Sequence, residues 1–576
     1  MTPSKLPDLV ELLCYRALDQ PELTGFLFLG NEATEPQALT YRKLDAKARA
    51  IGAQLQSMAP PGERALLFFP PGLEFVSAFF GCLYAGLIAV PLHIFRSNHN
   101  LAKFEAIAVD SQATVALMTA SLLAGFKGRL PPGSALAALQ CLATDDIAAG
   151  VDGSWQKPSV CGDTLAMLQY TSGSTGTPKG VMISHGNLLH NSAQIQASFE
   201  HTPESQGVIW LPPYHDMGLT GGILQPLYSG FPVVLMSPLD FLQKPFRWLQ
   251  AITRYGGTTS GGPNFAYDLC VKKTTPEQRA TLDLRTWDLA FTGAEPVRAE
   301  SLERFAATFE HCGFRSEAFY PCYGLAEATL FVSGGVKARK PNVRRVAATA
   351  LEHHQAAAAP ADGKSGRLLV GCGYPRLGQK ILIVDPETLT RCQEGEVGEI
   401  WVLGSSVTRG YWNSTEETEL AFNAYLSDGS EGPALRTGDL GFLQDGELFC
   451  TGRCKDLIII RGRNHYPQDI ELTVERSHPA LLPGGGAAFS VEAEGNERLV
   501  VVHEVGRKFI RTLNVDEAIR SIRRAVAQHH DLEVYAPVLI KPANIPRTSN
   551  GKVRRYLCRA MFLEGTLDVV GIANNA

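Results

Sequence analysis

The sequence predicts an α/β fold of more than one domain, with layered α/β subdomains first, a β-rich subdomain next, and a small α+β domain at the C-terminus. Its 576 residues are too many for one hydrophobic core. Short, continuous apolar runs alternate with helix-like stretches in the first half, which is typical of strands buried on both faces. From Ile381 onward, strands follow one another with little helix between them.

The first half contains the apolar runs that predict buried strands, at residues 65–69, 115–118, 208–211, 233–236 and 289–291. One longer stretch, Phe75 to Leu92, is uncharged and about as long as a membrane span. Because Gly81, Gly86 and Pro91 interrupt it, we expect a short helix followed by a buried strand at residues 87–90 instead.

The second half predicts two further units. The segments KILIVD, GEIWVLG, GELFCTG and DLIIIRG read as strands, with one helix-length gap near residues 416–425, so a β-rich subdomain is expected over about 370–454. Beyond it, a strand at 498–505, a helix at 515–527 and a strand at 538–540 predict an α+β unit. We therefore divide the chain into residues 1–454 and 455–576.

Charge and cysteine content argue against several classes of protein. The formal net charge is −5, from 53 basic and 58 acidic residues, so we expect no nucleic-acid partner. The twelve cysteines include no paired zinc motif, because Cys450 and Cys454 have no second pair or nearby histidine. The first residues lack the apolar core of a signal peptide, so we expect a cytoplasmic protein without a membrane span.

The stretch TSGSTGTPKG, from Thr171 to Gly180, is the first candidate binding site. Glycines let successive backbone N–H groups converge on an anion, while hydroxyls and Lys179 supply further donors. It is not a P-loop, because Pro178 and Gly180 occupy the glycine and hydroxyl positions of that motif. Taken alone, a stretch rich in Gly, Ser and Thr is more often just a loop.

The second candidate is PRTSNGKVRR, from Pro546 to Arg555. A glycine before a lysine in a turn can present an ammonium group at the end of an arm, where it could stabilise a phosphoryl group. The alternative is a solvated basic tail.

Five further segments decide between these readings: WLPPYHDMG, FTGAEPV, YGLAEAT, RTGDLG and GRCKDLIIIRGRNHYPQDIE. Together with the two candidates, in this order and spacing, they closely resemble the adenylate-forming superfamily of acyl-CoA synthetases, adenylation domains and luciferases. The resemblance covers nearly the whole chain. It implies the adenylate-forming fold with a mobile C-terminal domain, and an enzyme that uses ATP and Mg²⁺ to activate a carboxylic acid.

The resemblance also implies roles for individual residues. The catalytic set is Lys552, His215 and Glu327, with Glu327 as the Mg²⁺ ligand. The phosphate loop comprises Thr171, Ser172, Gly173, Ser174, Thr175, Gly176 and Lys179. Adenine and ribose would be bound by Gly293, Ala294, Glu295, Tyr323, Gly324, Asp439 and Arg453, while Lys455 or Asp456 would be the hinge. Asn550 departs from the serine that the family usually has near the lysine.

Two phrases, LPPYHDMGL and IIIRGRNHYPQDIE, closely resemble the fatty acyl-AMP ligases within this superfamily. That branch carries an insertion, to which residues 336–366 correspond, although the AAAAP stretch offers little apolar anchoring. No acidic residue is placed to bind a substrate amine, and an apolar tunnel would gain about 0.8 kcal/mol for each buried methylene.

The resemblance thus implies that a fatty acid is converted to acyl-AMP and then passed to the phosphopantetheine arm of an acyl carrier protein. A fatty acyl-CoA synthetase and an inactive nucleotide- or lipid-binding module remain alternatives. An NAD(P) oxidoreductase does not fit, because GCGYPRLG at Gly371 lacks the third glycine spacing and precedes a strand. We expect a monomer or weak dimer.

Overall fold

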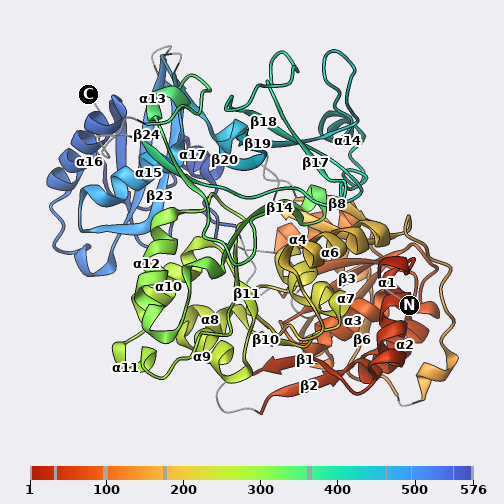
Figure 1. The fold of residues 1–576 in the computed structure, drawn as a ribbon. Coiled ribbons are helices and arrows are strands. Elements are labelled where there is room, and N and C mark those ends of the chain that lie inside the picture. Colours follow the sequence, from red (N-terminus) through yellow and green to blue (C-terminus); the bar gives the residue numbers. More distant parts are fainter. Residues whose placement is uncertain are drawn as a thin grey trace.

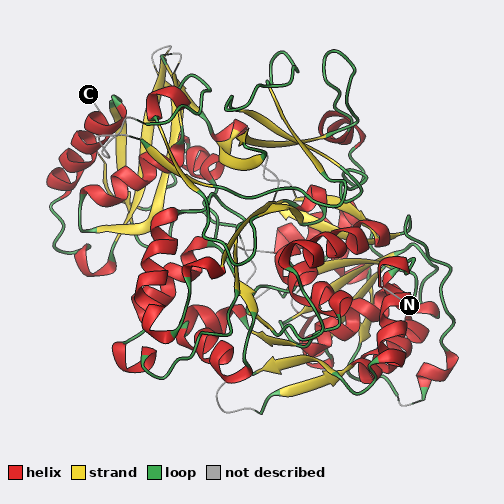
Figure 2. Cartoon of the chain, in the orientation of Figure 1, coloured by secondary structure: helices red, strands yellow, loops and turns green. Residues whose placement is uncertain are grey.

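The structure is a computed structural model that describes residues 3–30, 35–94, 101–126, 128, 130–148, 150–172, 178–359, 366–461, 463–493, 496–548 and 551–572. Helices and strands alternate through its first half, whereas strands dominate the upper right of the view (Figure 2). The predicted α/β class is confirmed by this arrangement and by the neighbours reported below.

Two large sheets form the N-terminal part of the molecule (Figure 1). One has the spatial order β14 (Phe331–Gly334), β13 (Phe319–Gly324), β12 (Leu289–Thr292), β11 (Thr259–Gly261), β9 (Gly207–Ile209), β10 (Val233–Met236), β1 (Thr24–Leu29) and β2 (Gln37–Thr40). The other has the order β6 (Gln140–Ala143), β5 (Val115–Met118), β3 (Arg64–Phe69), β4 (Ile88–His93), β7 (Leu165–Ser172) and β8 (Pro178–Ser184). Pairing is parallel in both interiors and antiparallel only at the edges.

The helices that cover these sheets are α1 (Leu9–Asp19), α2 (Tyr41–Gln56), α3 (Leu73–Tyr84), α4 (Leu101–Ser111), α5 (Ala120–Phe126), α6 (His185–Phe199), α7 (Gln225–Ser229), α8 (Pro238–Gln243), α9 (Phe246–Tyr255), α10 (Asn264–Lys273), α11 (Pro276–Arg279) and α12 (Ala299–Phe309). Most of them share one large hydrophobic core with both sheets, whereas α4 and α5 form a second core with the other face of the sheet that contains β3. A π-helix, η6 (Met217–Leu224), precedes α7. As predicted, the uncharged stretch from Phe75 forms a helix and then a buried strand, α3 and β4. No helix in the described part of the chain is both long and apolar enough to cross a membrane.

A smaller antiparallel sheet forms the β-rich region in the order β17 (Lys380–Val384), β18 (Gly398–Leu403), β19 (Leu435–Gln444) and β20 (Glu447–Arg453). The helix α14 (Thr415–Phe422) fills the gap in which the sequence predicted one. The strand β19 was not predicted, because its RTGDLG segment reads as a turn.

The C-terminal unit, residues 455–572, is built on the sheet β23 (Leu481–Ala493), β24 (Asn496–Val505), β25 (Val534–Ile540) and β26 (Val569–Ile572). The hairpin β21 (Ile458–Ile460) and β22 (Arg463–His465) leads into it. Alternate residues of β24 face opposite sides, so α15 (Pro467–Ser477) and α16 (Val515–His530) cover one face and α17 (Arg555–Leu563) covers the other.

The candidate insertion packs against the β-rich sheet. Its antiparallel strands β15 (Val343–Val346) and β16 (Arg367–Val370) flank a short helix, α13 (Ala348–Leu351). Leu351 and Val346 share a buried cluster with Phe442 and Phe449 of β19 and β20. The apolar anchor therefore comes mainly from residues outside the AAAAP stretch, from whose described residues only Ala356 packs against this cluster. Residues 360–365 lie outside the described part.

Gly218 allows the π-helix η6 to pass close to the preceding loop. A Cβ atom at this buried position would overlap the carbonyl oxygen of Pro212. We therefore predict that Gly218→Ala lowers the free energy of unfolding by about 1–3 kcal/mol, measured by chemical denaturation. The control is Gly153→Ala, because nothing lies within 4 Å of an added Cβ there. Equal stability of the two variants would contradict this account of the loop.

Candidate active site

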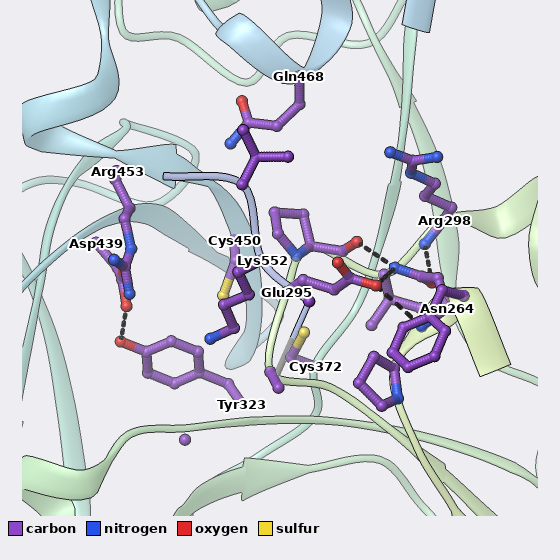
Figure 3. Close-up of a pocket in the computed structure, with 18 of the residues that line it drawn as sticks. Asn264, Glu295, Arg298, Tyr323, Cys372, Asp439, Cys450, Arg453, Gln468 and Lys552 are labelled. Carbon is purple, nitrogen blue, oxygen red and sulfur yellow. Dashed lines mark hydrogen bonds and ion pairs between the residues drawn. The ribbon is translucent and has the colours of Figure 1, made fainter. Parts of the chain in front are cut away.

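A single large cavity of 2380 Å³ lies where the N-terminal sheets, the β-rich sheet and the C-terminal unit meet. Its walls include the loops that follow β11, β12 and β13, at the carboxyl ends of these parallel strands. Ligands of open α/β sheets usually bind at such an edge. Figure 3 shows the side chains that converge there from both halves of the chain.

The loop after β12 carries the segment Gly293, Ala294 and Glu295. Glu295 accepts hydrogen bonds from the backbone N and the Nδ2 atom of Asn264, at 3.0 and 2.9 Å, which tie the loop to the start of α10. Ala294 has a φ of +67°, an unusual value for a residue with a side chain. The segment thus lines the cavity in a fixed conformation.

Tyr323 and Gly324 end the strand β13. A Cβ atom on Gly324 would overlap the carbonyl oxygen of Leu330, so only glycine fits this close approach of the two chain segments. The Tyr323 hydroxyl donates to Oδ2 of Asp439 at 2.8 Å, while Arg453 Nε donates to Oδ1 at 3.0 Å. Asp439 and Arg453 are direct partners across β19 and β20, which explains this pairing. The Asp439 carboxylate is therefore held at both of its oxygens.

Glu327 lies in a short turn just after β13. Burial raises the pKa of its carboxyl group, although a hydrogen bond from the Tyr411 hydroxyl, 2.9 Å from Oε1, acts in the opposite direction. The Tyr411 ring also lies 5.1 Å from Lys179 Nζ, which forms an ion pair with Glu417. Tyr411 thereby connects the predicted Mg²⁺ ligand to the lysine of the glycine-rich stretch.

The described ends of that stretch pair as antiparallel strands. Thr171 on β7 lies directly opposite Lys179 on β8, and Ser172 opposite Pro178. Gly173, Ser174, Thr175 and Gly176, which the sequence assigned to the phosphate loop, lie outside the described residues. The described strands bring both ends of the loop to the cavity, which Thr171 and Lys179 line.

His215 and Asp216 form a close pair at the start of η6. His215 Nδ1 lies 2.5 Å from Asp216 Oδ1, which also accepts the Met217 N–H at 2.7 Å. Burial alone would raise the pKa of Asp216, but His215 and the Lys552 ammonium hold it below its ordinary value. The sequence did not single out Asp216, although its place directly after His215 in YHDMG was a usable signal.

Lys552 enters the cavity from the C-terminal unit, on a turn between the bridge partners Arg547 and Val553. Thr548 N donates to Lys552 O at 2.8 Å, and Lys552 N donates to Thr548 Oγ1 at 3.1 Å. Asn550, the departure noted in the sequence, lies outside the described residues. The side chain extends between Glu295 and Tyr323 (Figure 3).

The electrostatic surroundings of Lys552 come mainly from the N-terminal half. Burial and the positive charge of Arg453 lower the pKa of the ammonium group, while Asp216, Asp439 and Glu295 act to raise it. Three carboxylates from separate segments of the N-terminal half therefore stabilise the charge of a cation that the C-terminal unit supplies.

Arg555 fixes the base of this turn. Its Nε and Nη2 atoms donate to the two carboxylate oxygens of Glu471, at 2.7 and 2.8 Å, and Nη1 donates to Asp456 Oδ2 at 2.7 Å. These bonds join α17 to α15 and to Asp456, one of the two predicted hinge residues. Arg555 and Glu471 each end a motif quoted from the sequence, but no role was predicted for either, because their contact spans 84 residues.

The insertion contacts the C-terminal unit as well as the β-rich sheet. Glu352 Oε2 accepts from Arg463 Nε at 2.7 Å, and the Glu352 carbonyl accepts from Asn464 Nδ2 at 3.0 Å. Arg367 Nε forms an ion pair with Asp469 at 3.0 Å. Charged and amide groups thus join the two parts on either side of residue 455.

Two family models match the chain: the AMP-binding enzyme model over residues 15–412, and the model of the AMP domain of Disco-interacting protein 2-like proteins over residues 455–571. The chain is 50% identical over 574 residues to a medium-chain-fatty-acid–[acyl-carrier-protein] ligase from Moorena producens, covering 99% of this chain and 97% of that one. It is 37% identical over 565 residues to a long-chain-fatty-acid–AMP ligase from Mycobacterium tuberculosis, covering 95% and 96%.

Among solved structures, the chain resembles a fatty acyl-adenylate ligase from L. pneumophila in complex with acyl adenylate and pyrophosphate. The TM-score is 0.77 and the identity 43%, with 99% of this chain and 98% of that chain covered. The expected adenylate-forming fold is therefore confirmed.

Arg555→Lys should weaken the base of the Lys552 turn, because lysine cannot make the two-point contact with Glu471. We predict a loss of about 2–3 kcal/mol in the free energy of unfolding of the C-terminal unit. Hydrogen exchange of the α17 amides would measure it. The control is Arg559→Lys, since Arg559 is exposed and makes one bond, to the Ser490 carbonyl. If the α17 amides exchange at the same rate in both variants, the role assigned to Arg555 is wrong.

Proposed function

The chain belongs to the AMP-binding enzyme family, in its fatty acyl-AMP ligase branch, and from this premise we propose how its cavity works. The enzyme joins a fatty acid to the AMP part of ATP with release of pyrophosphate, then transfers the acyl group to the phosphopantetheine thiol of an acyl carrier protein. One observation carries the assignment of the site: the Lys552 ammonium lies in the same cavity as Asp439, Glu327 and the described ends of the glycine-rich stretch.

ATP would lie along the carboxyl ends of the strands. We assign adenine to Gly293, Ala294, Glu295 and Tyr323, and the ribose hydroxyls to Asp439, whose two oxygens can accept two bonds. The phosphates would extend toward the paired ends of β7 and β8, where Lys179 would exchange its ion pair with Glu417 for the departing pyrophosphate.

Mg²⁺ fits this site as an ion shared with the nucleotide. Within the described residues no group of three or more His, Cys, Asp or Glu side chains could hold a metal by itself. Mg²⁺ commonly binds through one or two carboxylates together with phosphate oxygens and water. Glu327 would supply that carboxylate, and the ion would neutralise charge on the phosphates.

In the first half-reaction, a carboxylate oxygen of the fatty acid attacks the α-phosphorus of ATP, and the bond to the bridging oxygen of pyrophosphate breaks. Both reactants are anions, so their repulsion is the main obstacle. We propose that Lys552 contacts the carboxylate and the α-phosphate together, where a positioned charge stabilises the transition state most. Asp216 keeps the proton of His215 on Nδ1 and so orients the imidazole beside the acyl carboxylate.

In the second half-reaction, the thiol sulfur attacks the acyl carbonyl and AMP leaves with the electrons of the acyl–oxygen bond. We propose that the C-terminal unit rotates about Lys455 and Asp456 to admit the pantetheine arm. Transfer to coenzyme A is the second candidate. The relatives named as acyl-carrier-protein ligases support the carrier protein as the acceptor. The contacts of the insertion with Arg463 and Asn464 could restrict the rotation of this unit. A monomeric or weakly dimeric state stays a prediction.

The direct test incubates the protein with ATP, Mg²⁺ and a panel of fatty acids. Mass spectrometry should detect acyl-AMP, and then an acyl thioester once carrier protein is added. Rapid thioester formation with coenzyme A would instead support the acyl-CoA synthetase.

Lys552→Ala should reduce pyrophosphate release at least a hundredfold, because it removes the charge that stabilises the transition state. ATP affinity and thermal stability should change little. The matched control is Lys541→Ala, since that exposed lysine pairs with Asp568. Undiminished pyrophosphate release by the alanine variant would exclude the role.

In the unaltered enzyme, the lowered pKa of Lys552 predicts that activity falls with rising pH before the ordinary pKa of lysine is reached.

Shortening the insertion tests its control of thiol access. Val346 and Arg367 are direct partners, so replacing residues 347–366 with Asn-Gly would join β15 and β16 by a two-residue turn. We expect the ratio of acyl-CoA to acyl-carrier product to rise severalfold while pyrophosphate release persists. Glu352→Ala, which removes only the carboxylate that binds Arg463, should raise the ratio less. If both variants keep the original ratio, the insertion does not select the acceptor.

A further inference from the structure

The cavity continues well beyond the reacting groups. From the carboxyl ends of β9 and β11 it follows the sheet back toward the opposite edge, where its lining includes Gly207 and Thr259, the first residues of these strands. Phe199, Phe231 and Phe291 form apolar walls along this part. An extended acyl chain would fit such a passage.

The far end of this passage is polar. His201 is 7% exposed and lies between the Phe199 and Phe231 rings, with centroid distances of 5.3 and 4.8 Å. Its Nε2 atom is 3.2 Å from Thr259 Oγ1, and Thr259 is 5% exposed. Both His201 and Thr259 line the cavity. A passage built only for a methyl end would have no use for these groups.

A third side chain sets the direction of the hydrogen bonds. Gln225 Nε2 lies 3.2 Å from His201 Nδ1 and 3.0 Å from Ser229 Oγ. Burial lowers the pKa of His201 to about 3, so the ring is neutral and has one N–H. Because the Gln225 amide donates to Nδ1, the proton is on Nε2 and is donated to Thr259.

With this direction, two polar groups of the network have no partner among the described residues. The Thr259 oxygen accepts from His201, and its own O–H has no acceptor recorded among the described residues. The Gln225 Oε1 atom is likewise buried without a hydrogen-bond partner there. Buried polar groups rarely stay unpaired, because leaving one unsatisfied is costly.

We propose that the far end of the passage binds a fatty acid with an oxygen function, a hydroxyl or carbonyl, at or next to its terminal carbon. The Thr259 hydroxyl donates to that oxygen, while His201 and Gln225 hold Thr259 in place as positioning residues. This inference rests on the proposed function, because it concerns the other end of the same substrate.

The register of the sheet sets the expected length of the acid. Thr259 pairs with Leu289, the first residue of β12, and the loop that begins with Gly293 lies four residues farther on, a distance of about 13 Å along the strand direction. An extended chain of roughly ten carbons spans that distance. Shorter acids would leave the polar end unreached, and longer ones would have to bend.

The test compares saturated acids with their terminal hydroxy counterparts over about eight to fourteen carbons. In the wild-type enzyme, kcat/KM for acyl-AMP formation should favour the hydroxy acid about tenfold or more at the lengths that reach Thr259. Thr259→Val should abolish this preference, so that the ratio of kcat/KM for the hydroxy acid to kcat/KM for the saturated acid falls to about one at every length. His201→Phe should reduce the preference, since it removes the group that orients Thr259.

The matched control is Thr144→Val next to the other large sheet. Thr144 directly follows β6, and the variant removes a buried hydroxyl that has no hydrogen-bond partner among the described residues and does not line the cavity, so the preference should be unchanged. If the unsubstituted acid is preferred at every length, or if the preference for the hydroxy acid survives in both variants, the inference is overturned. Should no acid of either kind give acyl-AMP or pyrophosphate, the proposed function fails as well.

Discussion

The interaction on which the site depends is the attraction between the Lys552 ammonium and three carboxylates of the N-terminal half, Asp216, Glu295 and Asp439. Asp216 is the N-cap of η6, Glu295 lies in a loop and Asp439 lies on β19, so three separate segments of the chain place negative charge near the ammonium. The cation itself is borne on a turn whose base is fixed by Arg555. The site therefore combines a positive charge from the C-terminal unit with negative charges from residues before position 455.

The cavity separates charge from apolar surface along the direction of the strands. Charged and hydrogen-bonding side chains gather at the carboxyl ends, where backbone groups and loops are free to bind a nucleotide. The bodies of the same strands are short and carry aromatic and aliphatic side chains, which suits a hydrocarbon chain. One sheet thus provides both environments that joining a fatty acid to AMP requires. The exception is the group around His201, where polar atoms return at the far edge.

Much of the fold could be predicted because the parallel strands are continuous apolar runs, such as those that became β5 and β10. The strand β19 was missed for the opposite reason: Gly438 and Asp439 interrupt its apolar pattern because the site needs them there. For the site, ordered motifs indicated which residues to examine, and the structure brings Lys552, Asp439 and Glu327 together. No role was predicted for Asp216, Glu471 or Arg555, since their importance comes from contacts distant in sequence. The anchor of the insertion was also underestimated, because Leu351 lies outside the alanine run.

The alternation of side chains along β19 has a practical consequence. Asp439 points toward Tyr323 and the cavity, whereas Leu440 and Phe442 are buried with Val346 and Leu351 of the insertion. Asp439, the carboxylate assigned to the ribose, is therefore directly followed in the sequence by Leu440, which packs against the insertion. Anyone who re-engineers the insertion to accept a different thiol should therefore measure nucleotide affinity in the same variants, because a shift of this strand would be transmitted to both.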